Sequence, residues 1–184
     1  MRAASKAIVV VTFAFLALAV GRTPASAQGI EIGTSLFNGT FEAEDDGISA
    51  IGIPSGGFGI RNPGLYASFF AGQYVAIEPQ LGFVWFSLDG ESGHLLNFAG
   101  QFDWFPQGAK RSSPYVFASA GVLDAGDDYS PKSFGGGAGY RMLSGERLAL
   151  RFDVRYTHYT GEFADEDTNA VSFTVSIGGV FGQR

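Results

Sequence analysis

Seven charged residues lie at alternate positions of segments in which polar and apolar side chains alternate. They are Glu31, Glu78, Asp103, Asp153, Arg141, Arg151 and Arg155. Four acids and three bases enclosed on one side of a sheet have to pair, because an unpaired charge away from water is costly. We expect a salt-bridge network that closes the interior, centred on Asp153 because Arg151 and Arg155 flank it on one strand face. A gated or water-filled path lined by the same residues is the alternative.

Other chemistry-bearing residues form weaker patterns. His94 lies two residues after Ser92, and His158 lies two residues before Thr160. On a strand, each histidine would therefore share a face with a hydroxyl group. Such a pair would suit lipid hydrolysis, but histidines in aromatic-rich segments are more often tolerated polar residues. The acidic clusters at 124–128 and 165–167 lack EF-hand spacing, no cofactor motif is present, and cysteine is absent. We therefore expect no enzyme activity, no metal site and no cofactor.

The elements that must position these residues are β-strands. Alternation with a period of two is clear in segments 74–87, 94–105, 148–159 and 171–181. It is weaker in segments 29–37, 64–71, 113–123 and 133–143. No helical period follows residue 28, so the sequence predicts an all-β fold of eight strands.

The apolar positions of these strands carry large aromatic residues near the strand ends. They are Trp85, Trp104, Tyr115, Tyr140, Tyr156 and Phe181. Aromatic girdles at the two surfaces of a membrane explain this placement. The opposite positions hold mainly small residues, which suit the narrow interior of an eight-stranded barrel.

The connections between the expected strands alternate in length and charge. Four of them contain thirteen of the 18 acidic residues, and they span 38–47, 88–93, 124–132 and 161–169. The intervening connections at 71–73, 106–112 and 144–147 are shorter or less acidic. This alternation is typical of a barrel with long external loops and short periplasmic turns.

The amino terminus has the pattern of an export signal. Arg2 and Lys6 precede an uncharged stretch at 7–20, and small residues at 25–27 offer a cleavage site. Fourteen residues are too few for a bilayer-spanning helix, which needs about 20. We expect residues 1–27 to be a cleaved signal peptide and residues 28–184 to form one domain. Cleavage changes the formal net charge from −6 to −9, and such an acidic chain is a poor nucleic-acid binder.

Two segments carry a resemblance to a known family. Segment 65–83 resembles the second strand, first turn and third strand of small eight-stranded outer-membrane barrels. The glycine-rich segment 134–141 with 147–152 is similar to the sixth and seventh strands of that family, which includes the OmpA-type, OmpX-like and opacity-type proteins. The resemblance implies an antiparallel up-and-down transmembrane barrel in the outer membrane. It departs from the family at Phe181, which is followed by three further residues, and at the extra strand-like segment Ile48 to Ile53.

The expected function follows from these features. We expect a structural or surface-interaction role, in envelope integrity or adhesion, with the lumen closed by salt bridges. The expected partners are outer-membrane lipids and lipopolysaccharide, the assembly machinery and an extracellular partner of the acidic loops. A narrow porin-like channel is one alternative. A soluble secreted barrel that binds a small apolar ligand is another, and it requires the apolar positions to point inward.

Overall fold

The structure is a computed structural model, and it describes residues 29–42, 49–52, 64–88, 91–124, 131–160 and 168–182. The expected signal peptide at 1–27 and the central parts of the four acidic connections lie outside the described residues. The described residues contain no helix long and apolar enough to cross a bilayer.

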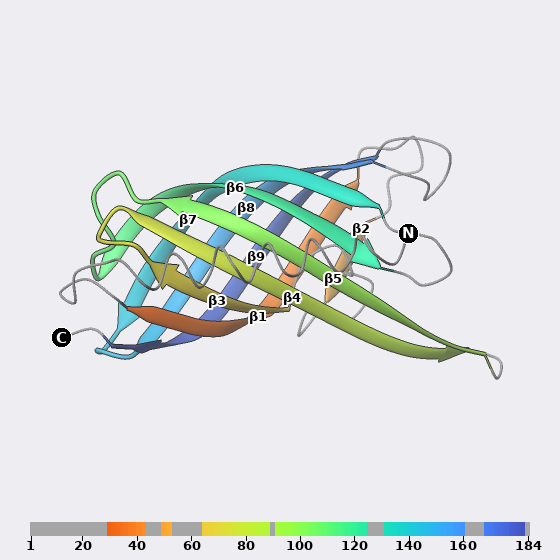
Figure 1. Cartoon of the computed structure of the whole chain (residues 1–184), viewed down its shortest axis with the longest axis horizontal. Helices are drawn as coiled ribbons and strands as arrows, with labels where there is room; N and C mark the ends of the chain where they lie inside the picture. The colour runs from red at the N-terminus through yellow and green to blue at the C-terminus, as the bar shows by residue number, and fades with distance from the viewer. Residues whose placement is uncertain are drawn as a thin grey trace.

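The described chain is a closed antiparallel barrel (Figure 1). Its strands are β1 (Ile30–Glu42), β2 (Ser49–Gly52), β3 (Leu65–Phe70), β4 (Val75–Leu88), β5 (Glu91–Trp104), β6 (Ser112–Asp124), β7 (Lys132–Ser144), β8 (Leu148–Thr160) and β9 (Thr168–Phe181). Each strand from β3 to β8 pairs with the next, and β1 closes the ring by pairing with β3 on one side and with β9, over residues Ile30 to Glu42, on the other. The predicted all-β eight-stranded barrel is confirmed.

Nine strands make an eight-stranded wall because β2 and β3 share one position. β3 pairs with the first part of β1, from Ile30 to Thr34, and β2 pairs with the later part, from Asn38 to Phe41. Residues Ser49–Gly52 of the segment Ile48 to Ile53 thus supply the upper end of the second barrel strand, which is one of the two interpretations that the sequence of this segment allows.

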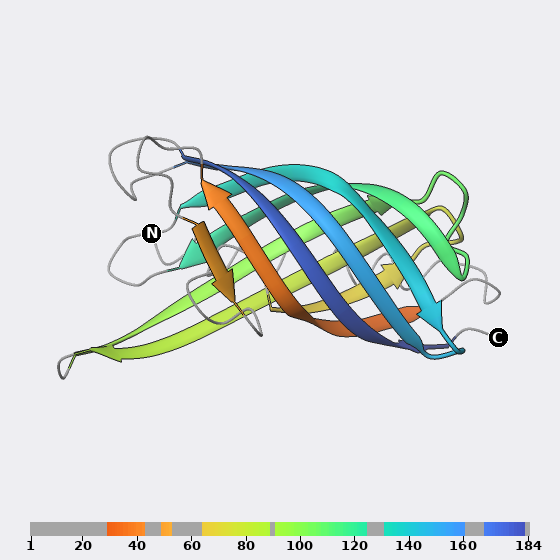
Figure 2. The same ribbon diagram turned by 180° about the vertical axis from the view of Figure 1, so that it is seen from behind.

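The two ends of the barrel differ. The turns at 71–74, 105–111 and 145–147 lie at one end with the start of β1 and the finish of β9, and we call this the turn end (Figure 2). The opposite end, the loop end, carries a two-stranded ribbon that we define as residues 83–88 of β4 and 91–96 of β5. β3 pairs with β4 only as far as Leu81, and β6 pairs with β5 only as far as Leu96. The ribbon therefore projects beyond the described parts of its neighbours.

The apolar positions face outward and the polar positions face inward. Phe83, Leu65 and Phe102 are 63 %, 55 % and 51 % exposed, whereas Glu31, Asp103 and Arg141 are fully buried. Lipid rather than water must cover such an outer wall, because large apolar side chains dominate it. A soluble ligand-binding barrel requires the alternating apolar positions to point inward, and in the described strands they point outward, so that alternative is wrong.

Three aromatic side chains point inward and occupy space that glycines leave free. Tyr66 lies against Gly33 and Gly178, Tyr115 against Gly139, and Phe117 against Gly137. A Cβ atom on Gly139 would lie 2.5 Å from Tyr115 Cζ, which no native contact allows. Gly137 and Gly139 of β7 therefore leave the space that the Phe117 and Tyr115 rings of β6 occupy.

We expect Gly139→Val to destabilise the barrel by about 1–3 kcal/mol, the usual cost of overpacking. Gly100→Val is the matched control, because a Cβ atom there meets no protein atom within 4 Å. Urea unfolding in lipid vesicles, followed by tryptophan fluorescence, measures both variants. Equal stabilities would show that the socket at Gly139 tolerates a side chain.

Candidate functional site

All seven predicted charged residues point into the barrel interior. Five of them form a group that we call the charge layer: Glu31, Glu78, Asp103, Arg141 and Arg151. Each is the second or fourth residue from the turn end of its strand, so the strand alternation brings them to a similar depth. The layer is built from five strands, β1, β4, β5, β7 and β8. No local sequence feature indicates that these residues of separate strands meet.

Arg151 is the centre of the charge layer. Its Nη1 donates to Glu78 Oε2 at 2.6 Å, and its Nε lies 2.6 Å from Glu31 Oε1. Its Nη2 donates to Ser68 Oγ at 2.8 Å, and that hydroxyl in turn donates to Glu78. One guanidinium thus bridges two carboxylates from different strands, and its planar fork fits this task better than an ammonium group would.

Glu31 receives a second guanidinium. Arg141 Nε donates to Glu31 Oε2 at 2.7 Å, and Tyr66 Oη donates to Glu31 Oε1 at 3.0 Å. Arg141 also lies over the Phe70 ring, with Cζ 5.1 Å from its centroid. Hydrogen bonds and ion pairs therefore occupy both oxygens of this fully buried carboxylate.

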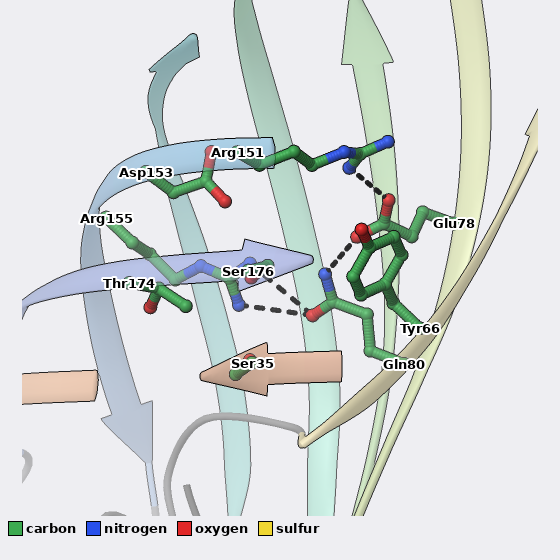
Figure 3. Close-up of a pocket in the computed structure, with 9 residues that line it drawn as sticks. All are labelled: Ser35, Tyr66, Glu78, Gln80, Arg151, Asp153, Arg155, Thr174 and Ser176. Atoms are coloured by element: carbon green, nitrogen blue, oxygen red, sulfur yellow. Dashed lines mark hydrogen bonds and ion pairs between the residues drawn. The ribbon is translucent and has the colours of Figure 1, made fainter. Parts of the chain in front are cut away.

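A second polar layer lies further from the turn end, and in it Arg155 contacts neutral amide groups such as that of Gln80 (Figure 3). Arg155 donates to Gln80 Oε1 at 3.3 Å and to Gln101 Oε1. Gln80 Nε2 donates to Glu78 Oε1 at 2.6 Å, so the glutamines connect Arg155 to the charge layer. A polar cavity of about 20 Å³ adjoins these groups, which is room for about one water molecule.

The predicted centre of the network is wrong. Asp153 accepts a hydrogen bond from Tyr115 Oη, and the ion pairs converge on Arg151 instead. Asp103 accepts from Gln101 Nε2 at 2.7 Å through Oδ1, while its Oδ2 has no hydrogen-bond partner among the described residues and lies 3.9 Å from Arg151 Nη1. Four carboxylates and three guanidiniums leave one formal negative charge in excess, and among the described residues Asp103 and Asp153 have no ion pair shorter than 3.9 Å.

Sequence reasoning missed the neutral partners of the network. Gln80 and Gln101 lie two residues from Glu78 and Asp103 in the same strands, so their shared strand face was readable from the alternation. Tyr66 and Tyr115 gave no such indication, because an aromatic residue at a strand end also suits a lipid-facing position. Their inward direction depends on glycines in neighbouring strands.

An aromatic cluster adjoins the charge layer, with Arg151 Cζ 5.6 Å from the Tyr115 ring centroid and Arg155 Cζ 5.0 Å from that of Phe117. We call it the aromatic plug, and it comprises Phe70, Ala76, Phe105, Tyr115 and Phe117. Phe105 is fully buried although it begins a turn, and its ring centroid lies 5.1 Å from that of Tyr115. The turn is held in place by Ala109 N–H, which donates to Gln73 O, and by Phe105 N–H, which donates to Tyr74 O. Tyr115 and Phe117 thus lie beside the arginines, whereas Phe70 and Phe105 lie between the charge layer and the turn end.

Comparison with known proteins bears on the fold alone. No protein-family model and no curated protein matches the sequence. Neisserial surface protein A is structurally similar, with a TM-score of 0.57 at 10 % identity over 83 % of this chain and 96 % of that one. Weaker likenesses link the chain to OprG of Pseudomonas aeruginosa (TM-score 0.48, 11 % identity, 85 % and 97 % covered) and to Ail, the attachment invasion locus protein of Yersinia pestis (TM-score 0.45, 12 % identity, 85 % and 99 % covered). The chain has the fold of the small eight-stranded outer-membrane barrels.

The aromatic residues of this outer-membrane barrel fold form bands on the outer wall. Trp104, Tyr140 and Phe181 are 49 %, 42 % and 56 % exposed near the turn end, and Tyr156 is 53 % exposed toward the loop end. Tyr115 does not belong to the girdle, because it is 1 % exposed and points into the lumen. The side chain of Trp85 is not among those that the structure describes. Tyr74, 49 % exposed at a turn, adds a residue that the alternation did not assign to this band.

The two histidines lie away from the charge layer. His158 is close to the loop end of β8, with Nδ1 3.0 Å from Asn169 Oδ1, whereas the side chain of His94 is not described. Within the described part of the chain, no group of three or more histidine, cysteine or acidic residues is arranged to hold a metal ion.

We expect Arg151→Ala to lower the free energy of unfolding by about 3–5 kcal/mol, because it removes the ion pair of buried Glu78 and leaves Glu31 with Arg141 alone. Asp103→Asn should change it by less than about 1 kcal/mol, since Asp103 has no strong ion pair to lose. Urea unfolding of both variants in lipid vesicles checks the ranking.

Arg111→Ala is the control for this comparison, because Arg111 is exposed at a turn. If Arg151→Ala does not refold, Arg151→Lys keeps the charge but loses the planar fork, and an intermediate loss is expected. A larger effect of Asp103→Asn than of either Arg151 variant would contradict the proposed centre.

Proposed function

We propose that this protein is a non-conducting outer-membrane barrel whose role is structural and whose working surface is the loop end. The observation that carries the proposal is the packing across the barrel interior of the Arg151 ion pairs and, nearer the turn end, of the Phe70 and Phe105 rings. An ion would have to break the Arg151 bridges and then pass apolar rings. Both steps are unfavourable, so the barrel interior is better suited to stability than to transport.

The loop end supports a surface-interaction role. The ribbon projects beyond the barrel, and its sequence is rich in apolar residues, among them Phe83, Trp85 and Phe86. One of the four acidic connections, 88–93, joins the two strands of the ribbon, and the other three join strands at the same end of the barrel. An apolar ribbon amid acidic loops suits contact with an extracellular partner, and a two-stranded ribbon with free edges offers backbone groups for strand addition.

We propose no catalytic role for the chain. Its partners in the membrane would be outer-membrane lipids, lipopolysaccharide and the assembly machinery that inserts it. A narrow channel is the second candidate, supported by the polar cavity between Gln80, Asp153 and Arg155. The two candidates differ in conductance.

We expect the refolded protein to insert into a planar bilayer without resolvable current steps. Because the two barriers act in series, Arg151→Ala alone should still give no steps, whereas Arg151→Ala combined with Phe105→Ala should give them. Single-channel recording tests all three proteins.

Arg111→Ala combined with Gln107→Ala, two exposed residues of the same turn, is the matched control and should remain silent. Reproducible steps in the unmodified protein would overturn the closed-lumen proposal and favour the channel. Steps in the Arg151→Ala protein alone would show that the aromatic plug is no barrier.

The surface role is tested by removing the ribbon. Phe83 and Leu96 are cross-strand partners, so an Asn-Gly turn joining them replaces residues 84–95 without shifting the register below. We expect this variant to fold and to keep the barrier of the outer membrane to large antibiotics, but to lose the adhesion of expressing cells to matrix-coated wells. Unchanged adhesion would show that the ribbon is not the contact surface.

A further inference from the structure

A groove crosses the lipid-facing wall of the barrel over β5, β6 and β7. It has a volume of about 320 Å³ and is lined by Phe98, Gly100, Ala120, Gly121, Val122, Lys132 and Phe134. This volume falls in the range of about 300–1,000 Å³ that is usual for small-molecule sites. The groove lies outside the lumen and is independent of the charge layer.

The floor of the groove is low because Gly100 and Ala120 face each other across β5 and β6. A Cβ atom on Gly100 would meet no protein atom within 4 Å. The inward-facing Gly121 differs, since its Cβ would lie 2.9 Å from Ala99 Cβ. Packing within the protein therefore does not require glycine at position 100, although glycine inside a strand costs about 0.5–1 kcal/mol. A glycine of this kind often marks the close approach of a ligand.

The upper end of the groove carries a positive charge. Among strand residues whose side chains the structure describes, Lys132 is the only charged residue that faces outward. It pairs with Val122 and Thr160 at the beginning of β7, next to the loop end. The outward residues of β8 change there from Val154 and Tyr156 to the polar His158 and Thr160, as expected at the membrane surface.

We propose that this groove binds one acyl chain of lipopolysaccharide and that Lys132 binds a phosphate of its lipid A. The inference rests on the proposed outer-membrane location. Phe98 and Phe134 provide the apolar walls, and Phe134 is 52 % exposed. An acyl chain fits an open apolar trough, and a phosphate at the membrane surface complements the ammonium group. A second copy of the barrel fits less well, because two concave faces are not self-complementary and would bring two lysines together.

The test is native mass spectrometry of the protein purified from outer membranes and titrated with lipid A in detergent. We expect one lipid A per chain. Gly100→Leu fills the floor without a protein clash and should weaken binding about tenfold or more, because each CH2 group withdrawn from an apolar contact lowers the affinity. Ala138→Leu adds the same bulk to the exposed wall outside the groove and should leave binding unchanged.

Lys132→Gln should weaken the binding of lipid A about fivefold and abolish the preference for lipid A over its dephosphorylated form. Lys110→Gln, at the turn end, is the matched control. Folding of every variant is checked by the mobility shift of unheated samples on gels. If Gly100→Leu did not fold, Ala120→Leu would fill the groove from the facing strand and should cause the same loss.

Three results would overturn the proposal. They are unchanged lipid A binding in folded Gly100→Leu or Ala120→Leu protein, equal affinity for phosphatidylglycerol, and a lipid-free dimer that Gly100→Leu disrupts. Conductance is measured separately. Current steps in the unmodified protein would contradict the closed lumen, whereas the lipid A titration tests whether the groove binds lipid.

Discussion

The closure of the backbone hydrogen-bond ladder between β1 and β9 is the constraint on which the rest of the structure depends. A bilayer offers no water to unpaired N–H and C=O groups, so a sheet in lipid must join its own first and last strands. A ring of eight strands encloses only a narrow space. That space must be filled by side chains whose polar atoms find partners inside it. The charge layer and the aromatic plug are two solutions to the same packing problem.

The interior combines ionic and aromatic packing in one layer. Arg151 bridges Glu31 and Glu78 while its guanidinium lies 4.8 Å from the centroid of the Tyr66 ring. The ring in turn fills space next to Gly33 and Gly178. Removing one member would therefore leave both an uncompensated charge and a void. Glycines differ between the lumen and the outer wall. Gly33, Gly139 and Gly178 in the lumen contact an aromatic side chain of the protein, whereas no protein atom occupies the space beside Gly100 on the outer wall.

The sequence predicted most of the fold and part of the site. Alternation with a period of two identified the eight barrel strands, and the same alternation assigned all seven charged residues to one face. It wrongly assigned Tyr115 to the outer girdle, whereas Tyr115 lies inward with Phe117. The reason is that an aromatic residue suits a lipid-facing position and a glycine-lined interior equally well. Nor did it identify Arg151 as the centre, because neighbours in sequence suggested Asp153, whereas the carboxylates that pair with Arg151 come from β1 and β4.

The sequence by itself determined which residues of a strand share a face, because strand alternation is a local property of the backbone. The tertiary structure decided which charged residues meet, which glycines accept an aromatic ring and where the outer wall is hollowed. Those features depend on the register between strands distant in sequence, such as β1 with β9 and β5 with β6. Register is a property of the closed ring, and the sequence of a single strand does not specify which residues of the neighbouring strand it will pair with.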